Sequence, residues 1–318
     1  MSEYITHTAV FEDCGRLALH SSGICAAFKI VLKKYWDIAS LGTLTRSGDK
    51  YTVELLKYCR ERWSSRAAGD FLEEKLAYVV GWRCHNAADR HFKPIYREVE
   101  PEHYKNEAGG RDPDERDVSD VRIYHDVIVW REVYDCGRKK GSPVSPFLLQ
   151  DNLGGHPSAG AMAVAPIESV LGGVVQRTLL GLQGFVKGQS DSAKWLARFQ
   201  KQLQDYYVDV HRYARAVEQP DPDFLRRFIL DNRFYDRRDA LIRLARALQA
   251  GKQLPEVKLE AAVAQAEHQS QYAQTIRQGY LYLAASSEFF EGKIGEPELR
   301  QRLDLGTSHY KPLSGGAQ

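Results

Sequence analysis

The stretch GWRCHNAAD at residues 81–89 closes an apolar run that begins at Phe71. Apolar residues lie on most sides of this run, which predicts a helix buried inside the protein. His85 and Asp89 are four residues apart, so a helix places both side chains on one face, one turn apart. Ionisable groups at the end of a buried helix need a partner. Two arrangements supply one: a hydrogen bond between imidazole and carboxylate, or a metal ion that both bind.

Helical spacing of apolar residues continues along most of the chain, which predicts an all-α fold built as a multi-helix bundle. We expect a loop at 42–48, an end to the central helix near Asp89 with its limit at Pro94, and a long acidic loop at 102–120. Residues 121–134 fit a strand or a helix, and we favour the helix. The other helices are predicted at 8–35, with a break near 21–23, and at 52–63, 192–217, 223–250 and 255–290.

The segment 141–157 is rich in proline and glycine and marks the predicted boundary between two helical halves. Residues 1–140 form the half that carries the candidate chemistry. Residues 141–318 form a second half, packed on the first as one continuous domain. The C-terminal tail at 307–318 is predicted to be disordered.

The amino-acid composition limits the classes of protein to which the chain can belong. With 43% hydrophobic and 27% charged residues, the 318-residue chain resembles soluble globular proteins. A formal net charge of +2 gives no electrostatic signal for nucleic acid or an anionic membrane. No signal peptide or membrane-spanning run is visible, so we expect a cytoplasmic protein. The five cysteines are scattered and odd in number, which argues against a disulfide framework and a thiolate zinc site.

Imidazoles and carboxylates are therefore the candidate metal ligands, and they gather in the first half of the chain. His7 lies near the start of the first helix, Asp49 follows a glycine in a loop, and His125 lies in a later predicted helix. With His85 and Asp89 they form a donor set without sulfur. Such a set suits zinc or another divalent ion such as iron or manganese.

The order of these groups resembles the zinc-dependent phospholipase C family, which is related in fold to the zinc single-strand nucleases. The resemblance implies an all-helical fold that holds two or three zinc ions. It implies that His85 and Asp49 bind one ion and that Asp89 bridges two. His7 and His125 would complete neighbouring sites. The match covers residues 5–135, and its best parts are THT at 6–8, LG at 41–42 followed by Asp49, and the run from 77 to 94.

Departures from the family pattern predict a remodelled site. Lys93 stands where the family usually has a histidine, and an ammonium has no lone pair for a metal. Val129 stands where a glutamate is expected, and Asp126 or Glu132 could substitute only at an altered spacing. A further histidine ligand expected from the family is also missing. Lys93 could instead replace a lost cation electrostatically, or bind a substrate phosphate.

These features predict a metal-dependent hydrolase, with zinc as the first choice of metal, that acts on a small-molecule or lipid phosphate ester or diester. Cations in such a site neutralise phosphate oxygens and lower the pKa of a bound water, whose proton Asp49 could accept. The main alternative is a helical scaffold of the same fold that has lost catalysis and binds a ligand or protein partner. An oxygen-using carboxylate–histidine centre is a third alternative. The long C-terminal helices could form a homodimer interface.

Overall fold

The computed structural model describes residues 4–44, 49–104, 119–134, 226–252, 255 and 257–303. In these ranges every regular element is helical, so the all-α prediction is confirmed. The α-helices of the first half are α1 (Tyr4–His20), α2 (Ala26–Lys34), α3 (Trp36–Leu44), α4 (Asp49–Arg62), α5 (Leu72–Val99), α6 (Pro101–Tyr104) and α7 (Asp120–Glu132). Those of the second half are α12 (Ala240–Gln249), α13 (Val257–Gln265), α14 (Gln271–Phe290) and α15 (Glu296–Arg302). Single turns are η1 (Trp63–Ser65), η2 (Ala68–Asp70), η3 (Arg226–Leu230) and η4 (Ala266–His268).

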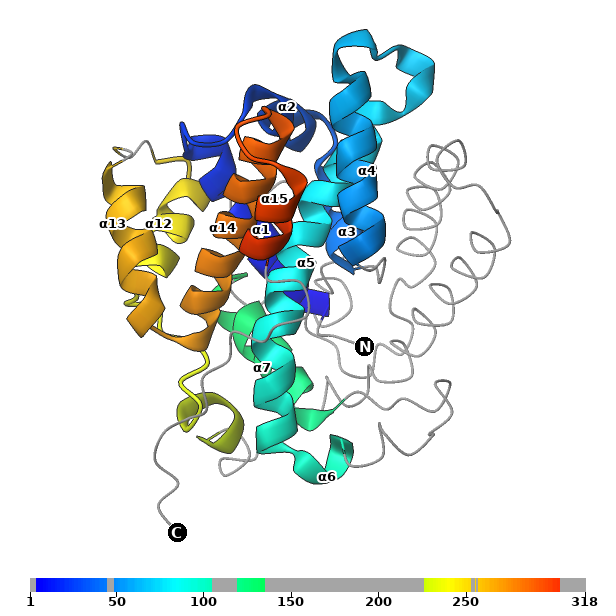
Figure 1. Ribbon diagram of the computed structural model, residues 1–318. Helices are drawn as coiled ribbons and strands as arrows, with labels where there is room; N and C mark the ends of the chain where they lie inside the picture. Colours follow the sequence, from blue (N-terminus) through cyan, green and yellow to red (C-terminus); the bar gives the residue numbers. More distant parts are fainter. Residues whose placement is uncertain are drawn as a thin grey trace, which may run out of the picture.

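Helix α5 runs through the middle of the bundle (Figure 1). Helices α1, α3, α4 and α14 all pack against it. Every residue of α5 from Lys75 to Ala88 is buried, as the apolar run predicted for a helix inside the protein. Ionisable groups on this part of α5 therefore face protein rather than bulk water.

Helix α5 continues through Pro94 to Val99, so the predicted end near Asp89 and limit at Pro94 are wrong. A proline inside a helix cannot donate to the carbonyl four residues before it, here that of Arg90, and costs about 3 kcal/mol. Buried aromatic and aliphatic side chains flank it on both sides, and each contributes roughly 1.5–3 kcal/mol on burial. Packing of Phe92 and Ile95 therefore outweighs the cost.

The contact between α3 and α5 depends on glycine. A β-carbon at Gly42 would stand 2.3 Å from the carbonyl oxygen of Tyr78, well inside the contact distance of two atoms. Gly42 thus serves close packing rather than a turn. The loop predicted at 42–48 is accordingly helical as far as Leu44, and residues 45–48 lie outside the described residues.

Two helices predicted in the second half are interrupted. The pattern at 223–250 is divided between the π-helical turn η3 and α12, and the pattern at 255–290 between α13, η4 and α14. The interruptions meet in space. The amide of Tyr272, at the start of α14, donates to the carbonyl of Phe234 at 2.8 Å, and the amide of Gln271 donates to the carbonyl of Arg233 at 3.0 Å. Backbone carbonyls at the break between η3 and α12 therefore accept hydrogen bonds from backbone amides at the break between η4 and α14.

The remaining predictions divide by where they fall. Residues 121–134 are helical as favoured, in α7. The short helices α3, α6 and α15 were not predicted, because so few residues give no clear period. Helix α6 includes residues 102–104 of the predicted acidic loop, and 105–118 lie outside the described residues. The boundary at 141–157, the helix at 192–217 and the tail at 307–318 lie outside the described residues. The four cysteines in the described ranges are buried free thiols. No helix described here has the length and apolar character to cross a membrane.

Candidate metal centre

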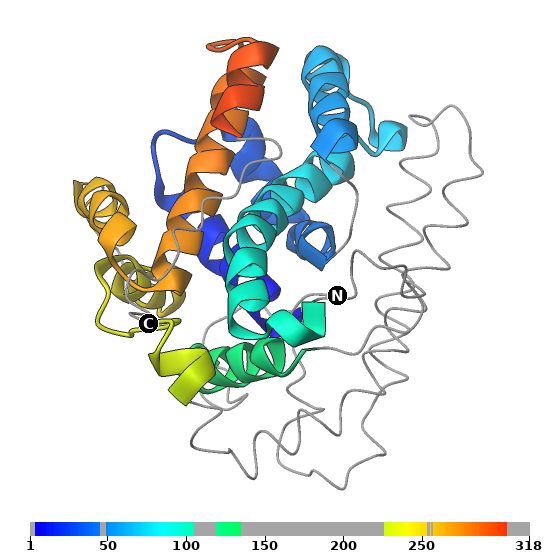
Figure 2. The same cartoon turned by 60° about the horizontal axis from the view of Figure 1, so that its bottom comes forward.

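Helices α1 and α5 bring two imidazoles and one carboxylate together. His7 lies on α1, and His85 and Asp89 lie one turn apart on α5, beside which α1 passes (Figure 2). His7 Nε2 is 3.4 Å from Asp89 Oδ1, and His85 Nε2 is 3.2 Å from Asp89 Oδ2. One ligand atom from each side chain lies within 4.8 Å of the other two. Among the described residues, this is the one group of three such side chains that meets that spacing.

These distances suit a tetrahedral ion. Ligands that bind zinc at about 2.0–2.1 Å in tetrahedral geometry lie about 3.3–3.4 Å from one another. The two nitrogen–oxygen distances in the cluster, 3.4 and 3.2 Å, are close to that spacing. The rings of His7 and His85 are tilted by 45° with centroids 4.8 Å apart, so the two imidazoles lie next to each other beside the carboxylate.

The start of α1, which carries His7, is fixed by α7. Asp126 is fully buried on α7, and its carboxylate accepts hydrogen bonds from the amides of Ile5 (3.2 Å) and Thr6 (2.8 Å). It also accepts one from the Thr6 hydroxyl at 2.7 Å. An acidic group at this position satisfies backbone donors that the first helical turn leaves open. Asp126, considered above as a substitute ligand, instead positions the helix that bears His7.

The orientation of His85 is set by a backbone carbonyl. Its Nδ1 lies 2.7 Å from the carbonyl oxygen of Thr43, near the end of α3. A carbonyl can only accept, so Nδ1 carries the hydrogen and donates it. In the neutral ring the remaining nitrogen, Nε2, then carries the lone pair, and it lies 3.2 Å from Asp89 Oδ2. Metal-binding histidines commonly donate their second ring nitrogen to a carbonyl in this way.

Burial and charge act in opposite directions on the two α5 groups. Burial lowers the pKa of His85 below its ordinary value, although the charge of Asp89 opposes that shift. Burial also acts to raise the pKa of Asp89, but His85, Lys93 and hydrogen bonding with His7 outweigh it. The pKa of Asp89 therefore lies well below its usual value. The cluster at neutral pH holds a carboxylate beside an imidazole that resists protonation.

Solvent reaches the cluster from the side of Lys93. The imidazoles of His7 and His85 are buried, whereas Asp89 is 16% exposed and Lys93 is 37% exposed. The ammonium of Lys93 donates to Asp89 Oδ2, one helical turn away. On the inner side, the indole of Trp82 stacks on the His85 ring with centroids 4.5 Å apart. The cluster thus has a buried indole against His85 and a partly exposed ammonium on Asp89.

The structure places the other predicted ligands elsewhere. His125 Nε2 lies 2.7 Å from the carbonyl oxygen of Phe228, and its ring stacks on Phe234 at 3.8 Å. It is a core histidine of α7 and is not part of the cluster. Glu132 is exposed at the end of α7. Asp49 begins α4, but its side chain lies outside the described residues, so its roles as ligand and proton acceptor stay predictions.

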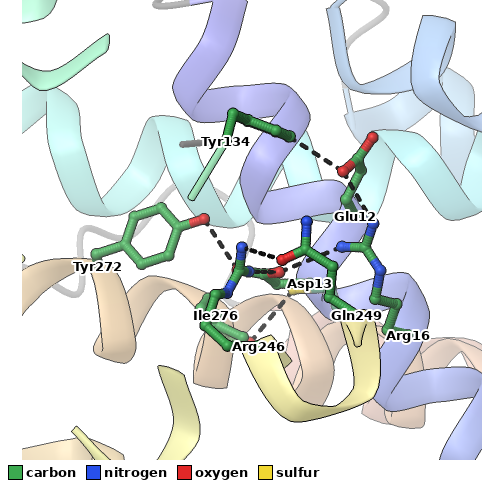
Figure 3. Close-up of polar contacts among 9 residues, drawn as sticks. Glu12, Asp13, Arg16, Tyr134, Arg246, Gln249, Tyr272 and Ile276 are labelled. Atoms are coloured by element: carbon green, nitrogen blue, oxygen red, sulfur yellow. Dashed lines mark hydrogen bonds and ion pairs between the residues drawn. The ribbon is translucent and has the colours of Figure 1, made fainter. Parts of the chain in front are cut away.

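A second buried polar network lies where α1, α12 and α14 meet (Figure 3). Asp13, fully buried on α1, accepts from the Tyr272 hydroxyl at 3.0 Å and pairs with Arg246 and Arg16. Glu12 beside it accepts from Arg16 at 3.0 Å and is also fully buried. Two carboxylates are thus matched by two guanidinium groups. The composition of this network is that of a structural tie between the two halves rather than a metal site.

Comparison of the chain with protein-family models, with curated proteins and with solved structures finds no match. The likeness to zinc-dependent phospholipases C therefore stays a prediction.

Proposed function

We propose that this protein binds a divalent metal ion, with zinc as the first choice, through His7, His85 and Asp89 and hydrolyses a phosphate ester. The observation that carries the proposal is the contact between His85 and Asp89. With its Nδ1 hydrogen donated to Thr43, the neutral His85 ring has its lone pair on Nε2. This buried nitrogen makes no hydrogen bond among the described residues and lies only 3.2 Å from a carboxylate oxygen. Two electron-rich atoms at this distance repel each other unless a cation lies between them.

That cation can be a proton or a metal ion. A proton on Nε2 would make His85 an imidazolium, which burial disfavours, as the direction of its pKa shift indicates. A metal ion would satisfy the lone pairs of His85 and Asp89 together. His7 Nε2, 3.4 Å from the other oxygen of Asp89, would supply the third ligand. Sets of two histidines and one carboxylate are typical of catalytic zinc sites, in which a fourth position stays open.

The donor set suits hydrolysis, and the surroundings suit an anionic substrate. A zinc ion held here would polarise a phosphate oxygen and lower the pKa of a water molecule. The carbonyl of Thr43 holds His85 in the tautomer that leaves Nε2 available. The Lys93 side chain provides a positive charge on the exposed side, where a substrate would enter. Compartment, assembly and the identity of the ester stay predictions.

A second function is favoured by one observation. The ammonium of Lys93 already compensates Asp89, so the cluster is charge-balanced without a metal ion. In that case the protein would be a helical scaffold in which the same residues stabilise the packing of α1 on α5. The scaffold would bind a partner or ligand without catalysis.

The deciding experiment measures zinc stoichiometry and phosphoesterase activity together. The full chain, prepared without a histidine tag, is stripped with a chelator, reloaded with zinc and analysed for bound metal. We expect about one zinc ion per chain. Hydrolysis of p-nitrophenyl phosphate and bis(p-nitrophenyl) phosphate is measured on the same samples.

The site variant is His85→Gln, which removes the imidazole and its Nε2 lone pair but keeps a polar side chain of similar length. The matched control is His91→Gln on the same helix. His91 is also buried, but its Nε2 lies 2.5 Å from Gln271 Oε1, outside the cluster. Zinc binding and hydrolysis should fall together in the first variant and persist in the second. A wild-type protein that binds no zinc, yet folds and loses stability in His85→Gln, would instead support the scaffold.

A further inference from the structure

One oxygen of Asp89 lies beside two nitrogens, one on Lys93 and one on His85. Oδ2 accepts from the Lys93 ammonium and also lies 3.2 Å from His85 Nε2. A metal ion bound by His85 and Asp89 would therefore share this oxygen with the ammonium. The metal ion and the ammonium would repel each other, because both positive charges would lie next to the same oxygen atom. Lys93 and the metal ion thus compete for Asp89.

Lys93 has freedom to move when it loses that competition. Its side chain is 37% exposed, and a lysine carries its charge on a flexible four-carbon stem. The two histidines are buried and cannot follow it. Displacement from Asp89 would leave the ammonium beside the site, on the side that solvent reaches.

The charge of the cluster then selects the ligand. Without metal, one negative charge on Asp89 is balanced by one positive charge on Lys93, and the neutral imidazoles add none. A bound divalent ion adds two positive charges, so the cluster as a whole then carries a net charge of two. A phosphate monoester or inorganic phosphate carries nearly two negative charges near neutral pH, whereas a phosphodiester carries one.

We infer that the site takes a dianionic phosphate group, and that Lys93 leaves Asp89 when the metal binds and then holds that group. This inference rests on the proposed function and narrows its substrate class to phosphate monoesters. Metal and phosphate binding are consequently coupled through one side chain. Because such coupling is reciprocal, phosphate must tighten metal binding by the same factor by which metal tightens phosphate binding.

The test measures zinc affinity rather than turnover. Metal-stripped full-length protein is titrated with zinc against a chromophoric chelator, alone, with inorganic phosphate, and with dimethyl phosphate as the singly charged probe. The variants are Lys93→Met, which removes the charge, and Lys93→Arg, which keeps it. Lys34→Met is the matched control, because Lys34 pairs at 2.6 Å with Glu73, a carboxylate that is 16% exposed like Asp89.

In the wild type we expect inorganic phosphate to tighten zinc binding on the order of tenfold, and dimethyl phosphate to change it by less than about twofold. Lys93→Met should bind zinc more tightly without phosphate, on the order of tenfold, because a competing cation is gone. The same variant should lose the effect of phosphate. Lys93→Arg should retain that effect, and Lys34→Met should match the wild type.

Two results would overturn this inference while leaving the proposed function in place. One is a wild-type protein that binds zinc with equal response to the singly and doubly charged probes, a comparison that needs no variant. The other is a Lys93→Met protein that binds zinc more weakly or keeps the full response to phosphate. Failure of the wild type to bind zinc would overturn the proposed function and this inference together.

Discussion

Gly81 of α5 and Ala39 of α3 touch backbone to backbone. A β-carbon added at Gly81 would stand 1.7 Å from the carbonyl oxygen of Ala39, a separation shorter than any non-bonded contact. The same crossing holds the carbonyl of Thr43 against His85 Nδ1 at 2.7 Å. The missing side chain at Gly81 therefore sets the position of the group that orients a candidate ligand.

Substituting Gly81 with alanine should separate the two helices and destabilise the protein. The clash involves backbone on both sides, so neither partner can rotate away, and we expect a loss of about 3 kcal/mol in the free energy of unfolding. Urea denaturation would measure it. Gly69→Ala is the control, because no heavy atom lies within 4 Å of a β-carbon at that position. Equal stability of the two variants would contradict the close crossing.

The carboxylate of Asp126 should stabilise the start of α1. In the wild type, the amides of Ile5 and Thr6 and the Thr6 hydroxyl donate to the two carboxylate oxygens of Asp126. Asp126→Asn removes the charge and leaves a single acceptor oxygen for these three donors. We expect a loss of about 1–3 kcal/mol, measured by urea denaturation. Asp236→Asn serves as the control, since that side chain pairs with the exposed Arg238 and should cost less than about 1 kcal/mol. A loss no larger than the control's would argue against the cap.

The low pKa of Asp89 predicts how its contribution to stability depends on pH. Burial acts to raise this pKa. The electrostatic effects of His85 and Lys93 and hydrogen bonding with His7 lower it by more than burial raises it, so folding favours the ionised carboxylate. The stabilisation is present above the unfolded pKa of about 3.9 and is lost as pH falls toward the lower folded value.

The measurement compares wild type with Asp89→Asn in a chelator, by denaturation at several pH values. The difference in unfolding free energy should shrink as pH falls below about 4, the range in which the unfolded carboxyl group takes up its proton. A difference that grows within this acid range would have the wrong sign for an ionised carboxylate in the folded state.

The tie between α1 and α12 should show strong coupling between its two charges. Arg246→Met leaves the fully buried Asp13 with Tyr272 and Arg16 as its remaining partners, and we expect a loss of about 2–4 kcal/mol. Combining it with Asp13→Asn should cost less than the sum of the single changes, because the second change removes the uncompensated charge. A double-mutant cycle by urea denaturation measures this, and additive losses would show that the pair does not interact.

The part of the site that lies on one helix could be predicted from the sequence. A separation of four residues within an apolar run places His85 and Asp89 on one face, whatever surrounds the helix. His7 is different, since its approach depends on how α1 crosses α5 and on the Asp126 cap. Local spacing contains neither fact, and His7 entered the prediction only through the order of groups along the chain.

His125 shows where reasoning from residue type fails. Its Nε2 contacts the carbonyl of Phe228, which is 103 residues away in sequence. No local pattern signals a contact with so distant a backbone group, and a histidine that is a core residue looks the same in sequence as one that binds metal. Thr43 was missed for a related reason: it acts through its backbone carbonyl, so its side chain gives no signal.

The stacking of Trp82 on His85 has an optical consequence. The indole is buried, and its ring centroid lies 4.5 Å from that of the imidazole, with 24° between the ring planes. A proton or metal ion gained by His85 places positive charge against that face, where the indole electrons interact with it directly. The protein thus contains its own fluorophore at the site: ion binding should alter the emission of Trp82 and leave the other tryptophans as an internal reference.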